Sequence, residues 1–139
     1  MLCAEDAVTA VEHGADAIWV SNAEGRGLDT APSTISVLQR VAEAAKRVNP
    51  KVEVYVDGGV RRGTDIVKCL ALGASIVFVG QPIAWGLYYG AKAGVVQLLT
   101  LLNEEVNTAM ALTCSLDVSQ LTEKHIIHHP FNSKERARL

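Results

Sequence analysis

The chain has 139 residues, of which 49% are hydrophobic and 20% charged, and its formal net charge is −2 at pH 7. This composition indicates one packed globular domain, or a piece of a larger one, and excludes a disordered chain. The near-neutral charge gives no basis for nucleic-acid binding, and no apolar run has the length needed to cross a membrane.

The first half of the chain predicts alternating helices and short buried strands. Residues 4–13 predict a helix, because acidic residues open it and Gly14 suits its C-terminal end. A strand is expected at 17–21 and a polar, charged loop at 22–31. Pro32 then opens a second helix, whose apolar residues recur at spacings of three and four.

The most informative stretch is Tyr55-Val56-Asp57-Gly58-Gly59-Val60-Arg61-Arg62-Gly63-Thr64-Asp65. Residues 53–56 predict a buried strand, and helical periodicity starts near Thr64. Between them, glycines let backbone N–H groups approach an anion, and the following helix presents its positive end. Arg61 or Arg62 adds a bidentate charged contact. The stretch therefore predicts a phosphate site, and the alternative is a tight strand-to-helix loop with solvated arginines.

A second β/α unit follows and repeats the first. Residues 66–72 predict a helix, 75–79 a strand, and Pro82 the first turn of another helix. The segments 5–21 and 64–80 align without a gap as helix, Gly-Ala and strand. Such alternation predicts parallel β/α units. Three strands cannot close a barrel, so we expect two exposed sheet edges.

The C-terminal third predicts a long helix at 94–112 and one short helix within 116–127. The apolar residues of the long helix are expected to face the core; they are Val95, Leu98, Leu99, Leu102, Val106 and Met110. His125, His128 and His129 have no acid or thiol partner at ligand spacing, so we expect no metal site. The three cysteines are odd in number and far apart, which is typical of a reducing compartment.

Taken together, these stretches resemble the FMN-dependent 2-hydroxy-acid oxidases and dehydrogenases, such as glycolate oxidase. The resemblance covers nearly the whole chain and is most specific from Asp57 to Asp65. It is also carried by Ala4-Glu5-Asp6-Ala7, Gly14-Ala15-Asp16-Ala17-Ile18, Val20-Ser21-Asn22, Leu70-Ala71-Leu72-Gly73-Ala74 and Val77-Phe78-Val79-Gly80. The family fold is a (β/α)₈ barrel of about 250 residues or more. The resemblance thus implies an α/β chain that is the C-terminal portion of a TIM barrel, with about three parallel β/α units plus C-terminal helices in residues 1–127.

The resemblance also implies roles for individual residues. Ser21 would contact the flavin ring, and Gly80 and Gln81 would lie beside the phosphate of FMN. The phosphate and ribitol would be held by Asp57, Gly58, Gly59, Val60 and Arg61. Arg26 would clamp the carboxylate of a 2-hydroxy acid, a task suited to its planar guanidinium. Strand ends of this kind are where barrel enzymes build their sites.

Three departures from the family pattern bear on activity. Ala23 stands where the family has the His that takes the proton from the hydroxy acid. Loss of a general base typically lowers the reaction rate by about 10²–10⁴-fold. Glu24 is an alternative base, but its side chain is expected to point elsewhere and its charge opposes the substrate anion. Gln81 replaces an Arg and loses a charge-assisted hydrogen bond. The family's earlier strands, one of which carries a Lys near the flavin, have no counterpart in the sequence.

Residues 128–139 are expected to form a tail outside the barrel. Its last residues, Ala137-Arg138-Leu139, resemble a C-terminal peroxisomal address, and the resembled oxidases include peroxisomal members. We therefore expect a peroxisomal location, or a cytoplasmic one if this address is not used.

The sequence leaves three functions open, and with them the question of whether the chain is an enzyme by itself. The first is the C-terminal part of an (S)-2-hydroxy-acid oxidase, an enzyme that turns a 2-hydroxy acid and O2 into a 2-oxo acid and H2O2. On this reading the isolated chain binds FMN weakly or not at all and has no activity by itself. The second is an active oxidase whose remaining barrel comes from another chain. The third is a non-catalytic half-barrel module that pairs, through its strand edges, with itself or with a full-length oxidase. Retention of FMN would distinguish them.

Overall fold

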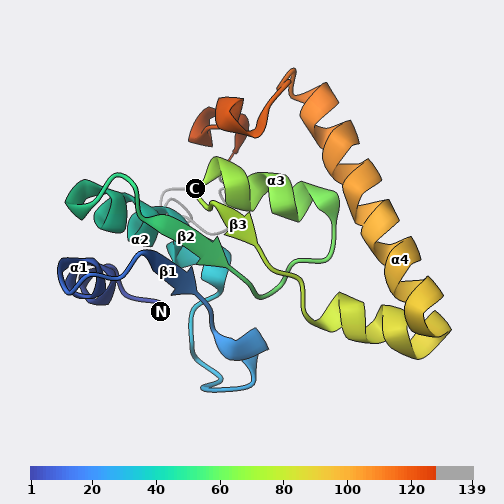
Figure 1. Cartoon of the computed structure of the whole chain (residues 1–139), viewed down its shortest axis with the longest axis horizontal. Helices are drawn as coiled ribbons and strands as arrows, with labels where there is room; N and C mark the ends of the chain where they lie inside the picture. Colours follow the sequence, from blue (N-terminus) through green and yellow to red (C-terminus); the bar gives the residue numbers. More distant parts are fainter. Residues whose placement is uncertain (128–139) are drawn as a thin grey trace, which may run out of the picture.

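The computed structural model describes residues 1–127; the tail at 128–139, where we expect a peroxisomal address and where two of the three clustered histidines stand, lies outside the described residues. The centre of the fold is a parallel sheet in the order β1-β2-β3 (Figure 1). Its strands are β1 (Ala17–Val20), β2 (Glu53–Val56) and β3 (Ile76–Val77). Trp19 pairs with Tyr55, and Tyr55 pairs with Ile76. The predicted α/β class with three parallel β/α units is confirmed.

Within residues 1–127, four α-helices connect and flank these strands. They are α1 (Ala4–Glu12), α2 (Thr34–Val48), α3 (Gly63–Ala71) and α4 (Gln81–Leu112), followed by 3₁₀ turns at Val118–Gln120 and Glu123–His125. A further 3₁₀ turn, η1 (Ala23–Gly25), follows β1. Helices α1 to α3 match their predicted positions within a few residues.

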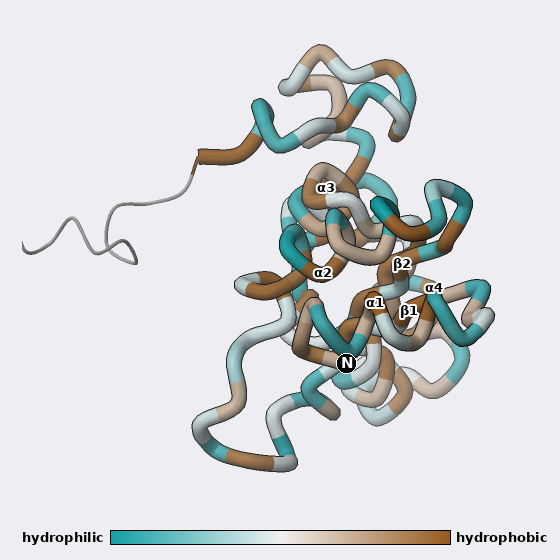
Figure 2. Tube along the Cα trace, turned by 90° about the vertical axis from the view of Figure 1, so that its left-hand side faces the viewer, coloured by the Kyte–Doolittle hydropathy of each residue, from teal (hydrophilic) through white to brown (hydrophobic). Residues whose placement is uncertain are grey.

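One face of the sheet carries the core. Alternate strand residues, Ile18 and Val20 on β1 and Val54 and Val56 on β2, are fully or almost fully buried against the helices. The apolar stripe of α2 packs onto the same cluster, and the strand segments are among the brown, hydrophobic parts of the trace in Figure 2. The alternation of one buried and one outward residue follows from the period of two along a strand.

The other face of the sheet carries aromatic side chains, and no helix within residues 1–127 covers it. Trp19 and Phe78 stack with ring centroids 4.6 Å apart, and Tyr55 meets both edge-on. Trp19 is 48% exposed and Phe78 38% exposed. In a closed barrel this face would line the interior.

Two predictions about the last strand and helix need correction. The strand expected at 75–79 is assigned at 76–77 only, although the N–H groups of Ser75 and Phe78 still donate to Val54 and Val56 of β2. No strand pairs with its outer edge in the described residues, so nothing holds it extended on that side. The short helix expected within 116–127 is replaced by two 3₁₀ turns.

Helix α4 is two helical arms joined by a sharp reversal. Gly90 and Ala91 have non-helical backbone angles, and Figure 1 shows the arms diverging at this point. The arms cross closely, because a Cβ on Gly94 would overlap the carbonyl oxygen of Gly86. The expected apolar stripe is only partly buried: Leu102 is buried, whereas Leu99 is 50% exposed. Part of the stripe thus lacks a partner within residues 1–127.

Among residues 1–127, no helix combines the length and apolar character required to span a bilayer. Within the same range, no three His, Cys, Asp or Glu side chains are grouped so that they could hold a metal ion.

Candidate functional site

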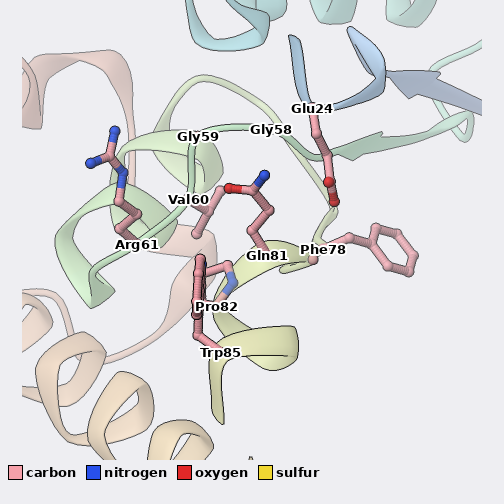
Figure 3. Close-up of a pocket in the computed structure, with 10 residues that line it drawn as sticks. Glu24, Gly58, Gly59, Val60, Arg61, Phe78, Gln81, Pro82 and Trp85 are labelled. Atoms are coloured by element: carbon pink, nitrogen blue, oxygen red, sulfur yellow. The ribbon is translucent and has the colours of Figure 1, made fainter. Parts of the chain in front are cut away.

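The C-terminal ends of the three strands meet at one edge of the sheet and form an open cavity of about 450 Å³ (Figure 3). This convergence follows from parallel strands, whose carboxyl ends share one edge. The cavity is lined by Glu24, Gly58, Gly59, Val60, Arg61, Phe78, Gly80, Gln81, Pro82 and Trp85. The loops after β2 and β3 therefore come together as the sequence predicts.

The loop after β2 depends on its two glycines. Gly58 and Gly59 have φ angles of 87° and 77°, a region that other residues rarely adopt. A Cβ at Gly58 would also lie 3.0 Å from Asn22 Oδ1 and 3.3 Å from Thr34 Oγ1. The buried Thr34 hydroxyl donates to the Gly58 carbonyl at 3.2 Å, so α2 holds the start of the loop. The backbone path after β2 is thus one that no other residue type would easily follow.

Two carboxylates hold the end of the same loop. Asp65 Oδ2 accepts hydrogen bonds from the N–H groups of Arg61 and Arg62, each at 3.0 Å. Glu105 Oε2 on α4 accepts from the N–H of Gly63 at 2.6 Å. These carboxylates satisfy N–H groups at the start of α3, which have no partners within the helix. The helix N-terminus is therefore already capped, and the open part of the loop is at Gly58–Val60.

Asp57 is the one side chain in residues 1–127 whose buried oxygen, Oδ1, has no hydrogen-bond partner. A buried acceptor without a donor costs about 1–3 kcal/mol, so native proteins rarely keep one without a role. Asp57 joins β2 to the glycine loop, next to the cavity. A ligand hydroxyl, such as that of a sugar or polyol chain, would supply the missing donor. The residues after β2 thus fit a phosphorylated polyol.

The loop after β1 has an unusual backbone. Ala23 and Glu24 have positive φ angles of 53° and 60°, and Gly25 follows at 75°. Ser21 Oγ accepts from Ala23 N at 3.2 Å, and Asn22 Oδ1 accepts from Gly25 N at 3.2 Å. Ser21 and Asn22 therefore stabilise this turn. Ala23 is exposed and has no group that accepts a proton.

The turn carries Glu24 to the loop after β3. A Cβ built on Gly80 would overlap the Glu24 carboxylate, whose Cδ lies 3.2 Å from that position. Gly80 is the N-cap of α4, so the carboxylate lies beside the positive end of a helix. Figure 3 shows Glu24 on one side of the cavity and the Arg61 side chain on the other, with the Gln81 amide between them. The Glu24 carboxylate thus occupies cavity space beside Gly80.

The remaining expected site residues are less closely gathered. Arg26 is exposed and is not among the residues that line this cavity. Ser21 and Asp57 lie at their strand ends behind the lining. Sequence reasoning missed Phe78, Pro82 and Trp85 as lining residues. Two signals could have found them: alternation along the strand puts Phe78 on the face of Trp19, and the spacing of four from Gln81 puts Trp85 on the same side of α4 as Gln81.

Cys69, which lies on α3 behind the glycine loop, is not a reactive group. Burial, and then the nearby Asp65 carboxylate, raise the pKa of the Cys69 thiol to about 11. A thiol must ionise to act as a nucleophile, so Cys69 stays protonated and packs in the core at neutral pH.

Comparisons with known proteins agree on one family. A family model described as FMN-dependent dehydrogenase matches residues 1–128. The 2-hydroxyacid oxidase of Dictyostelium discoideum is 48% identical over 126 residues, which are 91% of this chain and 32% of that protein. The 2-hydroxyacid oxidase 1 of Homo sapiens is 47% identical over 130 residues, which are 94% of this chain and 34% of that protein.

Solved structures with a similar fold come from the same kind of enzyme. The crystal structure of mandelate oxidase with (S)-2-phenylpropionate has a TM-score of 0.80 and 47% identity over 86% of this chain and 35% of that one. The monotopic membrane protein (S)-mandelate dehydrogenase has a TM-score of 0.86 and 36% identity over 93% of this chain and 33% of that one. The chain spans about a third of the length of the curated relatives it matches.

Proposed function

The chain belongs to the FMN-dependent dehydrogenase family, and from this membership we propose that it is the C-terminal part of an (S)-2-hydroxy-acid oxidase. The reaction of the whole enzyme would convert a 2-hydroxy acid and O2 into a 2-oxo acid and H2O2. Residues 1–127 would be the partial barrel domain and 128–139 its tail. The observation that carries the proposal is the unpartnered Asp57 Oδ1 beside the paired left-handed glycines.

The residues of this chain would hold the phosphate and ribitol side of FMN. Asp57 would accept from a ribitol hydroxyl, and the N–H groups of the Gly58–Gly59 backbone would face the phosphate. Arg61 would supply the positive charge. Gly80 and Gln81 would contact the phosphate from the start of α4. When bound, the flavin would supply the oxidation of the hydroxy acid and the reduction of O2.

Substrate handling is incomplete in this chain. Arg26 would bind the substrate carboxylate, and Ser21 would lie near the flavin ring. Ala23 occupies the position of the base, so we propose that the isolated chain oxidises no 2-hydroxy acid. Glu24 does not replace the missing base in this proposal, because its side chain turns to Gly80, at the start of α4.

The rest of the barrel would come from a partner, either another copy of the chain or the missing half-barrel. The uncovered sheet face supports this, because it exposes a stacked Trp19 and Phe78. The same observation favours the second candidate, a non-catalytic module that associates with itself or with a full-length oxidase. We further propose a peroxisomal location through Ala137-Arg138-Leu139.

The proposal is tested by supplying the upstream half-barrel of a full-length relative, with and without Ala23→His in this chain. Peroxide production from glycolate is expected only when both the half-barrel and the histidine are present. Histidine is among the residues that tolerate a positive φ, so the backbone at position 23 accepts the change. Peroxide from the unmodified chain alone, lost in Glu24→Gln, would contradict the proposal and identify Glu24 as the base.

A further inference from the structure

Glu24 lies where the cavity would have to accept an anion. Its Oε1 contacts Gly80, the N-cap residue of α4, and Glu24 lines the same cavity as the Gly58–Arg61 loop. Figure 3 shows the side chain entering from the β1 side toward the segment that follows Phe78. Three successive positive φ angles, at Ala23, Glu24 and Gly25, turn the chain into this path. The contact is therefore a product of the turn after β1.

No cation in the described part of the chain neutralises this carboxylate. In residues 1–127, Glu24 forms no ion pair, and the basic residue that lines the cavity, Arg61, extends from its opposite side (Figure 3). Gln81, next to Gly80, has a neutral amide. The positive end of the α4 helix dipole thus stabilises the Glu24 carboxylate itself.

We propose that Glu24 determines which ligands the cavity prefers: its carboxylate acts as an internal competitor that weakens the binding of a phosphate at the start of α4. The inference rests on the proposed flavin site and adds a selectivity to it. A phosphorylated flavin must displace or face a negative charge at this position. A flavin without phosphate meets no such repulsion, so the unmodified chain discriminates little between FMN and riboflavin.

Like charges repel strongly at a few ångströms, although an open cavity screens them in part. Removing the Glu24 charge is therefore expected to strengthen FMN binding about 10-fold, and by less in high salt. The ordinary alternative is a solvated carboxylate on an exposed loop, because Glu24 is exposed as a whole. On that alternative, removing its charge would change nothing.

The test is titration of the full chain with FMN and, separately, with riboflavin, followed by flavin fluorescence. The variants are Glu24→Gln, which keeps the side-chain size, and Glu24→Ala, which also removes the obstruction. The control is Asp29→Asn, which removes an equal charge from the same loop at a residue that does not line the cavity. Circular dichroism and the thermal midpoint check that each variant folds as the parent does.

We expect Glu24→Gln to strengthen FMN binding about 10-fold and riboflavin binding less than about twofold. Glu24→Ala should strengthen FMN binding at least as much as Glu24→Gln does. Asp29→Asn should change neither. Equal FMN affinity in the parent and both Glu24 variants would overturn the inference, as would equal gains for FMN and riboflavin or an equal gain in Asp29→Asn. If the chain completed by an upstream half-barrel makes peroxide and Glu24→Gln leaves FMN affinity unchanged, this inference fails while the proposed function stands. If neither the completed nor the isolated variants bind FMN, both fail.

Discussion

The Glu105 carboxylate of α4 accepts a 2.6 Å hydrogen bond from the backbone N–H of Gly63, the first residue of α3. The two residues are 42 positions apart, so this bond ties the C-terminal helix to the loop after β2. Gly63 is buried, and a Cβ there would overlap the backbone of α4 at Val106. The packing of α4 thus positions the end of the candidate phosphate loop from outside the cavity.

Glu105→Ala is expected to destabilise the chain by about 1–3 kcal/mol, because it leaves a part-buried N–H without an acceptor. Glu104→Ala, an exposed neighbour on the same helix, serves as the matched control and should change stability by less than about 0.5 kcal/mol. Urea unfolding followed by circular dichroism measures both. Equal effects of the two substitutions would show that the Glu105 contact contributes nothing specific.

Asp57→Ala is expected to weaken FMN binding without lowering the stability of the fold. The substitution removes a buried oxygen that has no donor, so the thermal midpoint should stay the same or rise. FMN binding by the chain completed with an upstream half-barrel should weaken by about 10-fold or more, as for a lost hydrogen bond to a charged group. Asp16→Ala, an exposed acid before β1, is the control. A clear fall in thermal midpoint with unchanged FMN affinity would make Asp57 a structural residue only.

Because the pKa of the Cys69 thiol is raised, we expect the folded chain to lose stability at alkaline pH. Burial raises the pKa of its thiol to about 11, above the value of about 8.5 for a free thiol. The unfolded chain therefore releases this proton first, and the stabilising contribution present below pH 8.5 is lost as the pH rises toward 11. The loss should be of the order of 2–3 kcal/mol. Cys69→Ala should flatten this part of the pH profile measured by urea unfolding, and an unchanged profile would exclude Cys69 as its source.

The uncovered aromatic face predicts self-association. Trp19 and Phe78 stack on a sheet face that no helix in residues 1–127 covers, and no further strand in that range pairs with the outer edges of β1 and β3. Sedimentation velocity at about 50 μM should show dimers or larger species, with edge-to-edge pairing as the expected arrangement. Replacing both Trp19 and Phe78 by Ser should shift the chain toward monomer, whereas Leu28→Ser, on the exposed loop after β1, should not. A sharp monomer peak for the parent chain would contradict this.

Local patterns were enough to predict most of the fold. The buried strand at 53–56, the left-handed glycines after it and the start of α3 follow from β-branched residues, Gly-Gly and helical periodicity, and all appear in the structure. The family resemblance, drawn from the same stretches, is confirmed by the match over residues 1–128. The roles of Ser21, Arg26, Gly80 and Gln81 toward FMN and substrate remain predictions.

Features that depend on distant contacts could not be predicted. Glu105 and Gly63 meet only because α4 folds back across α3 after its reversal at Gly90–Ala91. Ala23 and Glu24 carry no sequence signal for positive φ angles, since neither is glycine or asparagine. The direction of the Glu24 side chain toward Gly80 therefore emerged only with the structure. The short β3 likewise reflects a missing neighbour rather than its own β-branched sequence.

The central claim is that this chain supplies one side of an FMN site that needs the rest of the barrel. The most direct test compares the FMN content of the chain purified alone with that of the chain co-expressed with the upstream half-barrel of a full-length relative. For the chain alone we predict a dissociation constant for FMN above about 1 μM, the value that corresponds to a binding free energy of about −8.2 kcal/mol. After co-expression we predict one FMN per complex. Tight FMN binding by the chain alone, or a well-formed complex that holds no flavin, would contradict the account.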